Sequence, residues 1–321
     1  MRHRVGRVLA VGGFLLIAVA TLLPLPEQQA AARSTSLTCL VCGEYGGVDV
    51  IGNLLLFLPF AAGLSLLNWR VSSVVLTGAL LSLTVETLQL LLIPGRDASL
   101  SDLLTNTLSS WLGAALAGQA NALVWPAVGQ ARRLATGAVI AWCAVQAGSG
   151  ILLRPWIPAE ELRGDWTRHV PGRELFAGTV VSASASGIPI PDDSLPLEPS
   201  LVAALRRGDI ALQIEFKPEP RLPSRSPIVE VLGRSGTVLG LEADGEDLIF
   251  QAPARAQALR LRHPALRLRR VMTDRSPVQV TAREHQISLL ASWTGPDDGG
   301  RAHQDLGPRL GWSLIVPFKY A

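Results

Sequence analysis

Carboxylate and amide side chains recur in pairs at the ends of three strongly apolar segments. The pairs are Asp49 with Asn53, Glu86 with Gln89, and Asp102 with Asn106, and Arg96 falls between the second and third pairs. The spacing of three or four residues places both members of each pair on one face of a helix. Ionisable side chains are costly inside a membrane, so their recurrence at one predicted depth indicates a functional site.

A site of this composition admits three kinds of chemistry. Glu86 beside Arg96 can relay a proton or act as an acid-base pair. The carboxylate and amide oxygens can hold a divalent cation, which prefers oxygen ligands. Arg96 can bind the phosphate of a phospholipid or polyprenyl headgroup through two hydrogen bonds. The sequence has no dense carboxylate motif typical of metal-dependent phosphoryl enzymes, so we favour binding over catalysis. We expect no resident cofactor, with a divalent cation as the open alternative.

The same residues also have structural explanations. Asp49 and Asp102 suit the N-cap position of a helix, and Asn53 and Asn106 can hydrogen-bond between helices. Glu86 is harder to explain in this way, because a carboxylate one or two turns inside a membrane needs a partner. We therefore expect the whole set to form a polar pocket.

Five apolar segments must position these residues. They run roughly over residues 8–25, 50–67, 71–93, 103–125 and 134–153, and each is long enough to cross a hydrocarbon core of about 30 Å as a helix. The arginines near their ends are divided unevenly: Arg2, Arg4, Arg7, Arg70, Arg132 and Arg133 on one side, Arg33 and Arg96 on the other. The positive-inside rule then places the N-terminus inside and, after five spans, everything beyond about residue 153 outside.

Charge divides the 321 residues into two regimes. Residues 1–153 carry 14 charged side chains, whereas residues 154–321 carry 41. We expect a transmembrane domain at 1–153, a linker at 154–164, a soluble domain at 165–315 and a short tail at 316–321. The net charge of +3, without a basic tract rich in aromatics, argues against a nucleic-acid partner. Arginine outnumbers lysine 27 to 2, which is typical of a GC-rich bacterial genome.

Two cysteines, Cys39 and Cys42, form a Cys-x-x-Cys pair in the first outer loop. Outside a membrane such a pair is most often a disulfide, and a single pair without further Cys or His ligands is a weak signal for zinc. We expect a disulfide that closes the loop just before Asp49.

The polar residues also carry a resemblance. The string Asp49–Phe60 (DVIGNLLLFLPF), followed by Gly63, resembles the VanZ-like membrane family. So do Glu86-Thr-Leu-Gln89, Arg96, Ser101-Asp102, Asn106 and Gly113. The resemblance covers roughly residues 8–125. In that family a glycine follows the last Asn closely, whereas this chain has Ser109 and Ser110 before Gly113, so we expect looser packing there.

The resemblance implies a place at the outer face of a bacterial cytoplasmic membrane, near lipid-linked envelope material. The founding member of the family is linked to low-level resistance to the glycopeptide teicoplanin. The implied partner is a membrane lipid or a lipid-linked envelope precursor. A membrane enzyme that acts on lipid headgroups is the alternative from another functional class.

The C-terminal half changes to alternating apolar and polar residues, which is typical of strands. The expected strands cover residues 210–216, 228–232, 237–241, 247–250, 258–262, 278–281 and 287–292. Short strands separated by turn residues predict an all-β sandwich or jelly roll, and the pattern resembles a concanavalin A-like or laminin-G-like domain.

That resemblance implies glycan binding. Candidate glycan contacts are Trp166, Trp293 and Trp312 with Asp244, Asp247, Asp297 and Asp298, although each also fits a core or turn position. Leu259–Arg270 alternates Leu and Arg, which predicts a basic strand face for lipid headgroups or an anionic polymer, or a merely solvated face. A membrane-anchored lectin-like module, in which the polar cluster only holds helices together, is therefore a further alternative.

Overall fold

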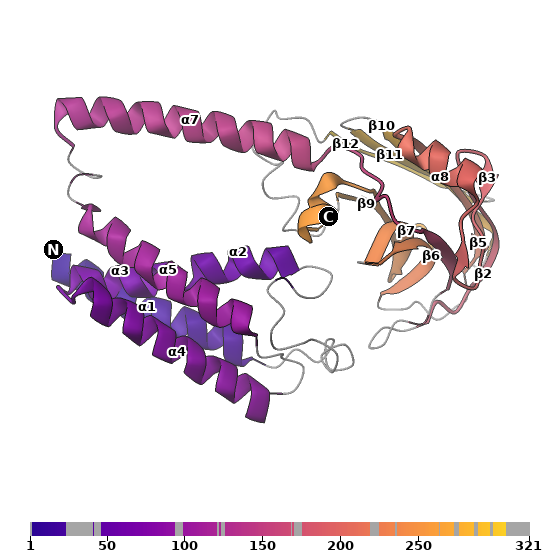
Figure 1. The fold of residues 1–321 in the computed structure, drawn as a ribbon. Coiled ribbons are helices and arrows are strands. Elements are labelled where there is room, and N and C mark those ends of the chain that lie inside the picture. Colours follow the sequence, from indigo (N-terminus) through magenta and orange to yellow (C-terminus); the bar gives the residue numbers. More distant parts are fainter. Residues whose placement is uncertain are drawn as a thin grey trace. The chain divides into compact units, whose positions relative to one another are not determined.

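The computed structural model describes most of the chain as helices and strands. The described residues are 2–23, 41, 46–93, 99–120, 122, 126–167, 169, 175–218, 225–234, 236–262, 264–272, 276–285, 288–295 and 298–305. They form two compact units, Met1–Trp142 and Cys143–Ala321, which are considered separately. The first is helical and the second is mostly β-structure, which confirms the predicted fold class (Figure 1).

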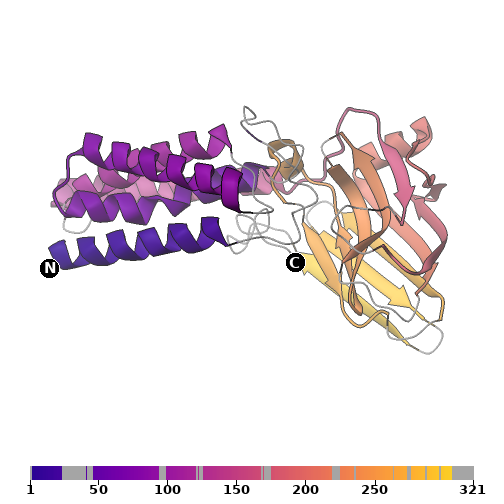
Figure 2. The same ribbon diagram turned by 90° about the horizontal axis from the view of Figure 1, so that it is seen from below.

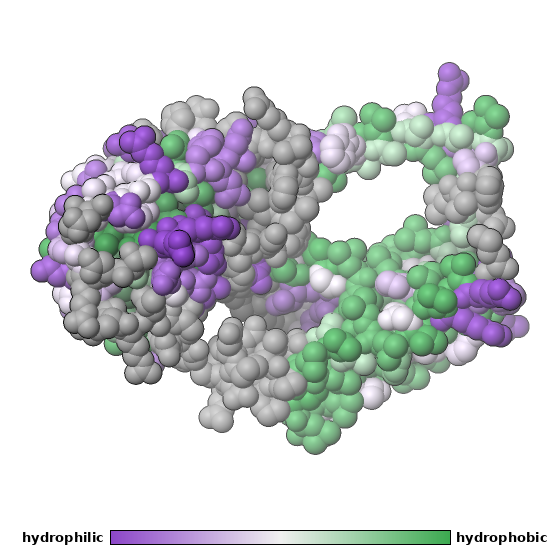
Figure 3. All heavy atoms as spheres, turned by 180° about the vertical axis from the view of Figure 1, so that it is seen from behind, coloured by the Kyte–Doolittle hydropathy of each residue, from purple (hydrophilic) through white to green (hydrophobic). Residues whose placement is uncertain are grey.

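The first unit is a bundle of antiparallel helices. They are α1 (Arg2–Leu22), α2 (Gly46–Leu56), α3 (Leu58–Leu66), α4 (Val71–Leu92) and α5 (Leu100–Gly118), and α7 (Val128–Leu152) follows. Figure 2 shows α1 to α5 running side by side. Large apolar side chains cover the outside of the bundle (green in Figure 3), as expected where lipid replaces water.

Four helical segments in the described part of the chain are long and apolar enough to cross a membrane. They are α1, α2 with α3 as one segment (Gly46–Leu66), α4 and α7. The expectation of five spans is therefore corrected to four. The segment that fails is α5, because Ser101, Asp102, Asn106, Ser109 and Ser110 reduce its apolar character. These polar side chains lie on a helix that packs against α2, α3 and α4 within the bundle.

Small residues allow the helices to approach closely. A Cβ atom built on Gly63 of α3 would lie only 2.3 Å from the backbone nitrogen of Ala10 in α1. Backbone contact of this kind is typical of membrane helices, where packing replaces the hydrophobic effect as the source of association. Phe57, Phe60 and Val85 fill the remaining interior.

A proline interrupts the second span. Helix α2 ends at Leu56, and α3 begins at Leu58 with Pro59 in its first turn. Proline has no N–H to donate, and its ring clashes with the carbonyl group four residues earlier. Backbone carbonyl oxygens of the preceding turn therefore lose their normal hydrogen-bond donors. Inside a membrane these acceptors need other donors, and a neighbouring helix supplies one.

The second unit is a sandwich of two six-stranded sheets in which all paired strands are antiparallel. The sheet orders are β4-β1-β6-β7-β8-β9 and β12-β11-β10-β5-β2-β3. The first sheet comprises β1 (Arg163–Trp166), β4 (Leu195–Pro196), β6 (Ser226–Gly233), β7 (Gly236–Asp244), β8 (Asp247–Gln251) and β9 (Ala265–Leu268). The second comprises β2 (Thr179–Ala185), β3 (Ile188–Pro189), β5 (Asp209–Lys217), β10 (Val278–His285), β11 (Ser288–Thr294) and β12 (Gly299–Asp305). A short helix, α8 (Pro199–Arg206), precedes β5.

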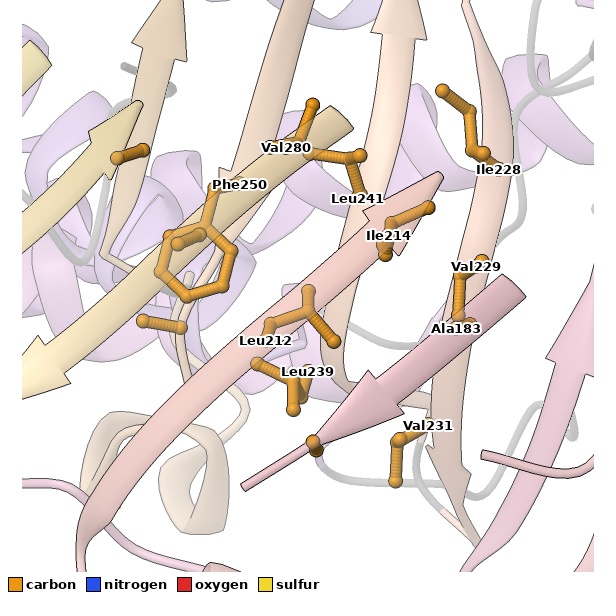
Figure 4. Close-up of a cluster of buried hydrophobic side chains, with 14 of the residues drawn as sticks. Ala183, Leu212, Ile214, Ile228, Val229, Val231, Leu239, Leu241, Phe250 and Val280 are labelled. Atoms are coloured by element: carbon orange, nitrogen blue, oxygen red, sulfur yellow. The ribbon is translucent and has the colours of Figure 1, made fainter. Parts of the chain in front are cut away.

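The sandwich core lies between the two sheets. On β5, Ile210, Leu212, Ile214 and Phe216 are all buried, as the alternating sequence predicts. Figure 4 shows Leu212 and Ile214 of β5 beside Leu239, Leu241 and Phe250 of the other sheet. Leu153, at the end of α7, also belongs to this core, so the sandwich begins before its first strand.

Six of the seven predicted strands are present, and one prediction is wrong. Residues 255–259 form a 3₁₀ helix, and Arg260 then adopts a left-handed conformation with φ of 53°. The Gln257 side chain anchors this turn by donating to the carbonyl oxygen of Thr237 at 2.8 Å. The strand begins only at Ala265, so the continuous basic face expected over Leu259–Arg270 is absent. Asp298 fits the turn position that the sequence also allowed, and β12 begins directly after it, at Gly299.

Candidate functional site

The predicted polar residues lie on three neighbouring helices of the bundle. Asp49 and Asn53 are on α2, Glu86 and Gln89 on α4, and Asp102 and Asn106 on α5. Arg96, Cys39 and Cys42 fall outside the described residues, as does the predicted tail at 316–321. The bundle therefore brings together three helices that each carry one acidic and one amide side chain.

A regular ladder of contacts joins α4 to α5. At the end of the ladder farthest from Ser99, Gly78 faces Ser110, whose side chain occupies the place of a Cβ on Gly78. One turn further, Asn106 Nδ2 donates a 3.0 Å hydrogen bond to Ser82 Oγ. One turn further again, Glu86 and Asp102 occupy the corresponding positions of the two helices. Each step moves four residues along both helices in opposite directions, which is one face of two antiparallel helices.

Glu86 is the most buried carboxylate of this ladder, with 8% of its surface exposed. Its Oε2 atom accepts a 2.7 Å hydrogen bond from the backbone N–H of Ser99. Ser99 is the N-cap of α5, and its hydroxyl accepts from the backbone N–H of Ser101 at 3.1 Å. Glu86 thus lies against the positive end of the α5 dipole, which stabilises a negative charge.

Two amide oxygens near this carboxylate pair have no donor among the described residues. Gln89 Nε2 donates to the carbonyl oxygen of Thr21 in α1 at 3.0 Å, which leaves Gln89 Oε1 buried without a partner. Asn106, only 2% exposed, likewise has an unpartnered Oδ1. A buried acceptor without a donor costs about 1–3 kcal/mol, so each is a place where a donor would bind favourably.

Helix α2 is joined to the same region through the proline break. Ser109 Oγ of α5 donates a 2.6 Å hydrogen bond to the carbonyl oxygen of Leu54. Ser109 and Ser110 are both fully buried. Gly113 also makes close backbone contact with Leu58. The expected loosening at Ser109 and Ser110 is therefore wrong, because Ser109 bonds to α2 and Ser110, whose hydroxyl donates to Asn106 within α5, packs against Gly78 of α4.

The three carboxylates differ in their exposure. Asp49, in the first turn of α2, is exposed, Asp102 is half-buried, and Glu86 is buried. Among the described residues, no group of three or more His, Cys, Asp or Glu side chains is arranged to hold a metal ion. Of the other two carboxylates, Asp102 is the one that interacts electrostatically with Glu86. Asp102 lies in the first turn of α5, whose N-cap is Ser99.

Several residues of this network were not predicted. Ser82, Ser99 and Ser109 donate or accept hydrogen bonds that connect helices, and Thr21 contributes a backbone carbonyl. Ser82 is four residues before Glu86, so the spacing that paired the carboxylates with amides would also have found it. Thr21 acts through its backbone, which no side-chain pattern can indicate.

The glycan contacts predicted in the sandwich mostly have structural roles. Trp293 lies in the core, and Trp166 packs against it. Arg267 bridges two of the carboxylates, with Nη2 2.5 Å from Asp244 Oδ2 and Nη1 2.9 Å from Asp247 Oδ2. Asp298 Oδ1 accepts from the N–H of Gly299 at 2.7 Å, as in a turn. Trp312 and Asp297 fall outside the described residues.

The Asp247 carboxylate illustrates how firmly these charges are held. Burial alone would raise the pKa of Asp247. The hydrogen bond from the Arg270 N–H and the guanidinium of Arg267 outweigh burial, so the pKa is lowered from its usual value. Asp244 and Asp247 are thus already bound to an internal cation.

Another buried carboxylate of the sandwich, Glu284, lies on β10 and was not among the predicted residues. Glu284 faces the core in the row of Val278, Val280 and Ala282 and is 0% exposed. Neither of its oxygens has a hydrogen-bond partner among the described residues. Burial raises the pKa of Glu284 to about 9, so the side chain is neutral at pH 7.

Comparison with known proteins finds one similarity, and it falls in the helical unit. Residues 12–121 match the family model VanZ/LLP1, which confirms the resemblance drawn from the polar residues. The matched region contains the whole α4/α5 ladder. No curated protein and no solved structure matches the chain. The helical unit is therefore similar to the VanZ/LLP1 family over residues 12–121, and the concanavalin A-like and laminin-G-like assignments of the sandwich stay predictions.

Proposed function

We propose that this chain is a bacterial cell-envelope membrane protein whose VanZ-type unit binds a lipid-linked or phosphate-bearing ligand in the outer leaflet. The observation that carries the proposal is the α4/α5 interface, where Glu86 and Asp102 occupy corresponding turns of two packed helices and the buried Oδ1 of Asn106 has no partner among the described residues. Like charges held together among apolar helices are unfavourable without a compensating group. We assign phosphate binding to Arg96, the only basic residue between α4 and α5 in the sequence.

The proposed orientation rests on arginines that flank two helices. Arg2, Arg4 and Arg7 lie in the first turns of α1, and Arg132 and Arg133 lie near the start of α7. The positive-inside rule places both helix starts in the cytoplasm. The end of α7, and the sandwich that follows it, then lie outside. Both starts lie on one side only if an even number of segments crosses between them, so this orientation requires α5 to traverse the membrane together with α1, α2–α3 and α4.

The orientation has a direct test. A cysteine-reactive reagent that cannot cross the membrane should modify an engineered Ser200→Cys in intact cells, because Ser200 is exposed on α8. Modification only after cell lysis would place the sandwich inside and overturn the outer location.

The binding proposal is tested with two conservative variants in cells. Glu86→Gln and Asp102→Asn keep the side-chain shapes and remove the charges, and Thr87→Val changes an exposed residue of the same helix as a control. We expect both charge variants, but not the control, to alter the envelope lipid profile and the susceptibility to glycopeptides. If all three insert at wild-type levels and leave both readouts unchanged, the proposal fails.

An enzyme that acts on lipid headgroups is the second candidate, because two neighbouring carboxylates can divide acid and base roles between them. Purified protein should then convert phospholipid or polyprenyl phosphate substrates, and Asp102→Asn should abolish turnover. Absence of turnover with and without divalent metal would exclude this candidate and leave binding as the function.

The sandwich enters the proposal as an outer module that contacts glycan near the membrane. Because Trp293 and Arg267 have structural roles, such contacts would come from other surfaces of the unit. Removing residues 165–321 while keeping the bundle should then weaken the cellular phenotype without removing lipid binding. Unchanged phenotype after this deletion would leave the sandwich without a role in the proposed function.

A further inference from the structure

We propose that the end of the sandwich joined to α7 lies on the membrane surface and binds the headgroups of anionic phospholipids. Four residues form this basal surface: Arg154, Arg234, Arg255 and Leu259. All of them belong to the second unit, and none is part of the polar site on α4 and α5. The inference goes beyond the proposed function and holds for either orientation of the chain in the membrane.

The depth of Arg154 follows from the uncharged stretch of α7. Residues 134–153, between Arg133 and Arg154, carry no charged side chain. At a rise of about 1.5 Å per residue this stretch is about 30 Å long, which matches the hydrocarbon core of a bilayer. Trp156, half-buried two residues later, is of the residue type enriched at membrane interfaces. Arg154 therefore lies where the hydrocarbon core meets the lipid headgroups.

The sandwich begins within one turn of the end of α7. The N–H of Leu153 donates to the Ser149 carbonyl oxygen at 3.0 Å, and the N–H of Arg154 donates to the Ile151 carbonyl oxygen at 3.3 Å. Leu153 is only 1% exposed and belongs to the sandwich core. The end of the span and the sandwich thus form one compact unit, so this end of the sandwich must lie at the membrane surface.

The 3₁₀ helix Arg255–Leu259 is held at the same level. The backbone N–H of Arg255 donates to the carbonyl oxygen of Arg154 at 3.1 Å, so the start of this helix lies at the headgroups as well. Leu259, at its other end, is 56% exposed. A large apolar side chain exposed at this level can enter the boundary between headgroups and acyl chains.

The β6–β7 hairpin lies at the same end of the first sheet. Gln257 of the 3₁₀ helix donates to the carbonyl oxygen of Thr237, near the start of β7, at 2.8 Å. Gly233 pairs with Gly236, so Arg234 lies in the turn between the two strands. The hairpin therefore adds a third arginine to the end of the sheet that carries the 3₁₀ helix.

The basal surface has an excess of positive charge. Its three arginines are exposed, and none of them forms an ion pair with a carboxylate among the described residues. Of the carboxylates at this end, Glu160 accepts from the backbone N–H of Arg234 at 2.7 Å, and Glu161 is paired with Arg163 at 3.3 Å. Guanidinium groups donate paired hydrogen bonds to phosphate, so anionic phospholipid headgroups complement this surface in charge and in geometry.

The opposite end of the same sheet has balanced charge. Asp244 pairs with Asp247 in the β7–β8 hairpin, whereas the basal end of β8 is Gln251. The charged residues at the opposite end are three acids and three arginines: Asp244, Glu246, Asp247, Arg267, Arg269 and Arg270. The unbalanced positive charge thus lies at the end that α7 joins to the membrane, and the opposite end supplies matched control positions.

The test measures lipid contact of the full-length protein in nanodiscs. A fluorescent amino acid replaces Leu259, or replaces the exposed Arg269 at the opposite end of β9 as the control. The discs contain phosphatidylcholine alone or mixed with phosphatidylglycerol, and part of the lipid carries a bromine quencher on the upper acyl chain. We expect strong quenching at position 259 in the mixed discs, weaker quenching in phosphatidylcholine, and none at position 269 in either.

Charge variants test whether the arginines hold this contact. Arg154→Gln and Arg255→Gln each remove one basal charge, and Arg269→Gln removes one at the opposite end. In the mixed discs each basal variant should lower the ratio of lipid-contacting to free label about fivefold, which is about 1 kcal/mol. Arg269→Gln should leave the ratio unchanged. Added salt should weaken the contact in the mixed discs, because exposed charges are screened.

Three results would overturn the inference. Absence of quenching at position 259 in both discs would place the basal surface away from the membrane. Equal quenching in both discs would show a contact without preference for anionic lipid. A label that lipid does not quench, but whose emission shifts with a soluble anionic polysaccharide, would assign the arginines to a polymer.

The comparison of the two lipid compositions needs no arginine variant, so the inference stays testable if a variant fails to fold. None of the changes alters α4 or α5. Failure of this inference would therefore leave the proposed function of the helical unit intact.

Discussion

The backbone N–H of Ser99 donates a 2.7 Å hydrogen bond to Oε2 of Glu86, so a carboxylate from α4 lies at the N-terminus of α5. This contact gives Glu86 a structural role as well as a place in the proposed site. The two roles can be separated, because an amide can replace the acceptor without replacing the charge.

Glu86→Ala should destabilise the bundle more than Glu86→Gln does. Alanine leaves the Ser99 N–H without its acceptor, which costs about 1–3 kcal/mol. Glutamine keeps a carbonyl acceptor and removes the repulsion with Asp102. Thermal unfolding of purified protein in detergent checks the order. Equal losses for the two variants would show that the hydrogen bond to Ser99 contributes little.

Ser109→Ala should destabilise the bundle by about 1–3 kcal/mol, because the Leu54 carbonyl would lose its donor next to the Pro59 break. Thr107→Val is the matched control. Thr107 Oγ1 donates only to the Leu103 carbonyl within its own helix, at 2.6 Å. A control as damaging as Ser109→Ala would mean that bonds between helices have no special weight here.

Gly78→Ser should disrupt the α4/α5 contact, because Ser110 already occupies the space beside Gly78. Ser110→Gly should restore much of the lost stability, since the exchange moves one side chain from α5 to α4. A double-mutant cycle measured by thermal unfolding gives the coupling energy. Additive effects of the two changes would contradict direct packing of these residues.

Glu284 should make the sandwich less stable as pH rises. In the folded chain its pKa is about 9, against a value of 4.5 for the unfolded chain. The favourable contribution of the neutral form is therefore complete below about pH 4.5 and is lost as pH rises towards 9. Each pH unit in this window costs about 1.4 kcal/mol, or about 3 kcal/mol between pH 4.5 and 7.

Glu284→Gln should raise the unfolding temperature of the full-length protein at pH 7 and flatten its dependence on pH in this window. Glu161→Gln, at an exposed position, is the control. A Glu284→Gln protein with the same pH dependence as wild type would show that another group dominates the titration.

The sequence predicted the elements in which apolar residues recur at a regular spacing. Ile210, Leu212, Ile214 and Phe216 alternate strictly, and they lie on one buried face of β5 as expected. The segment at 258–262 alternates as well, yet Gln257 holds the backbone of Thr237 and turns the chain before a strand can form. A tertiary hydrogen bond of this kind has no signature in local spacing.

The candidate site was predicted only in part, again because local spacing does not indicate tertiary contacts. Spacing of three and four residues placed Glu86 and Asp102 on helix faces, but it could not give the relative register of α4 and α5. That register depends on Gly78, whose missing side chain accommodates Ser110. The polar character of α5 was noticed, whereas its effect on the number of spans was not.

The most direct test of the account is a double-mutant cycle on lipid binding with Glu86→Gln, Asp102→Asn and the combined variant. If both carboxylates contact one ligand, the second change should add little to the first, so that the combined loss of affinity for a phosphate-bearing lipid is clearly smaller than the product of the two single losses. Losses that multiply, or single variants that bind as wild type does, would contradict a shared site between α4 and α5.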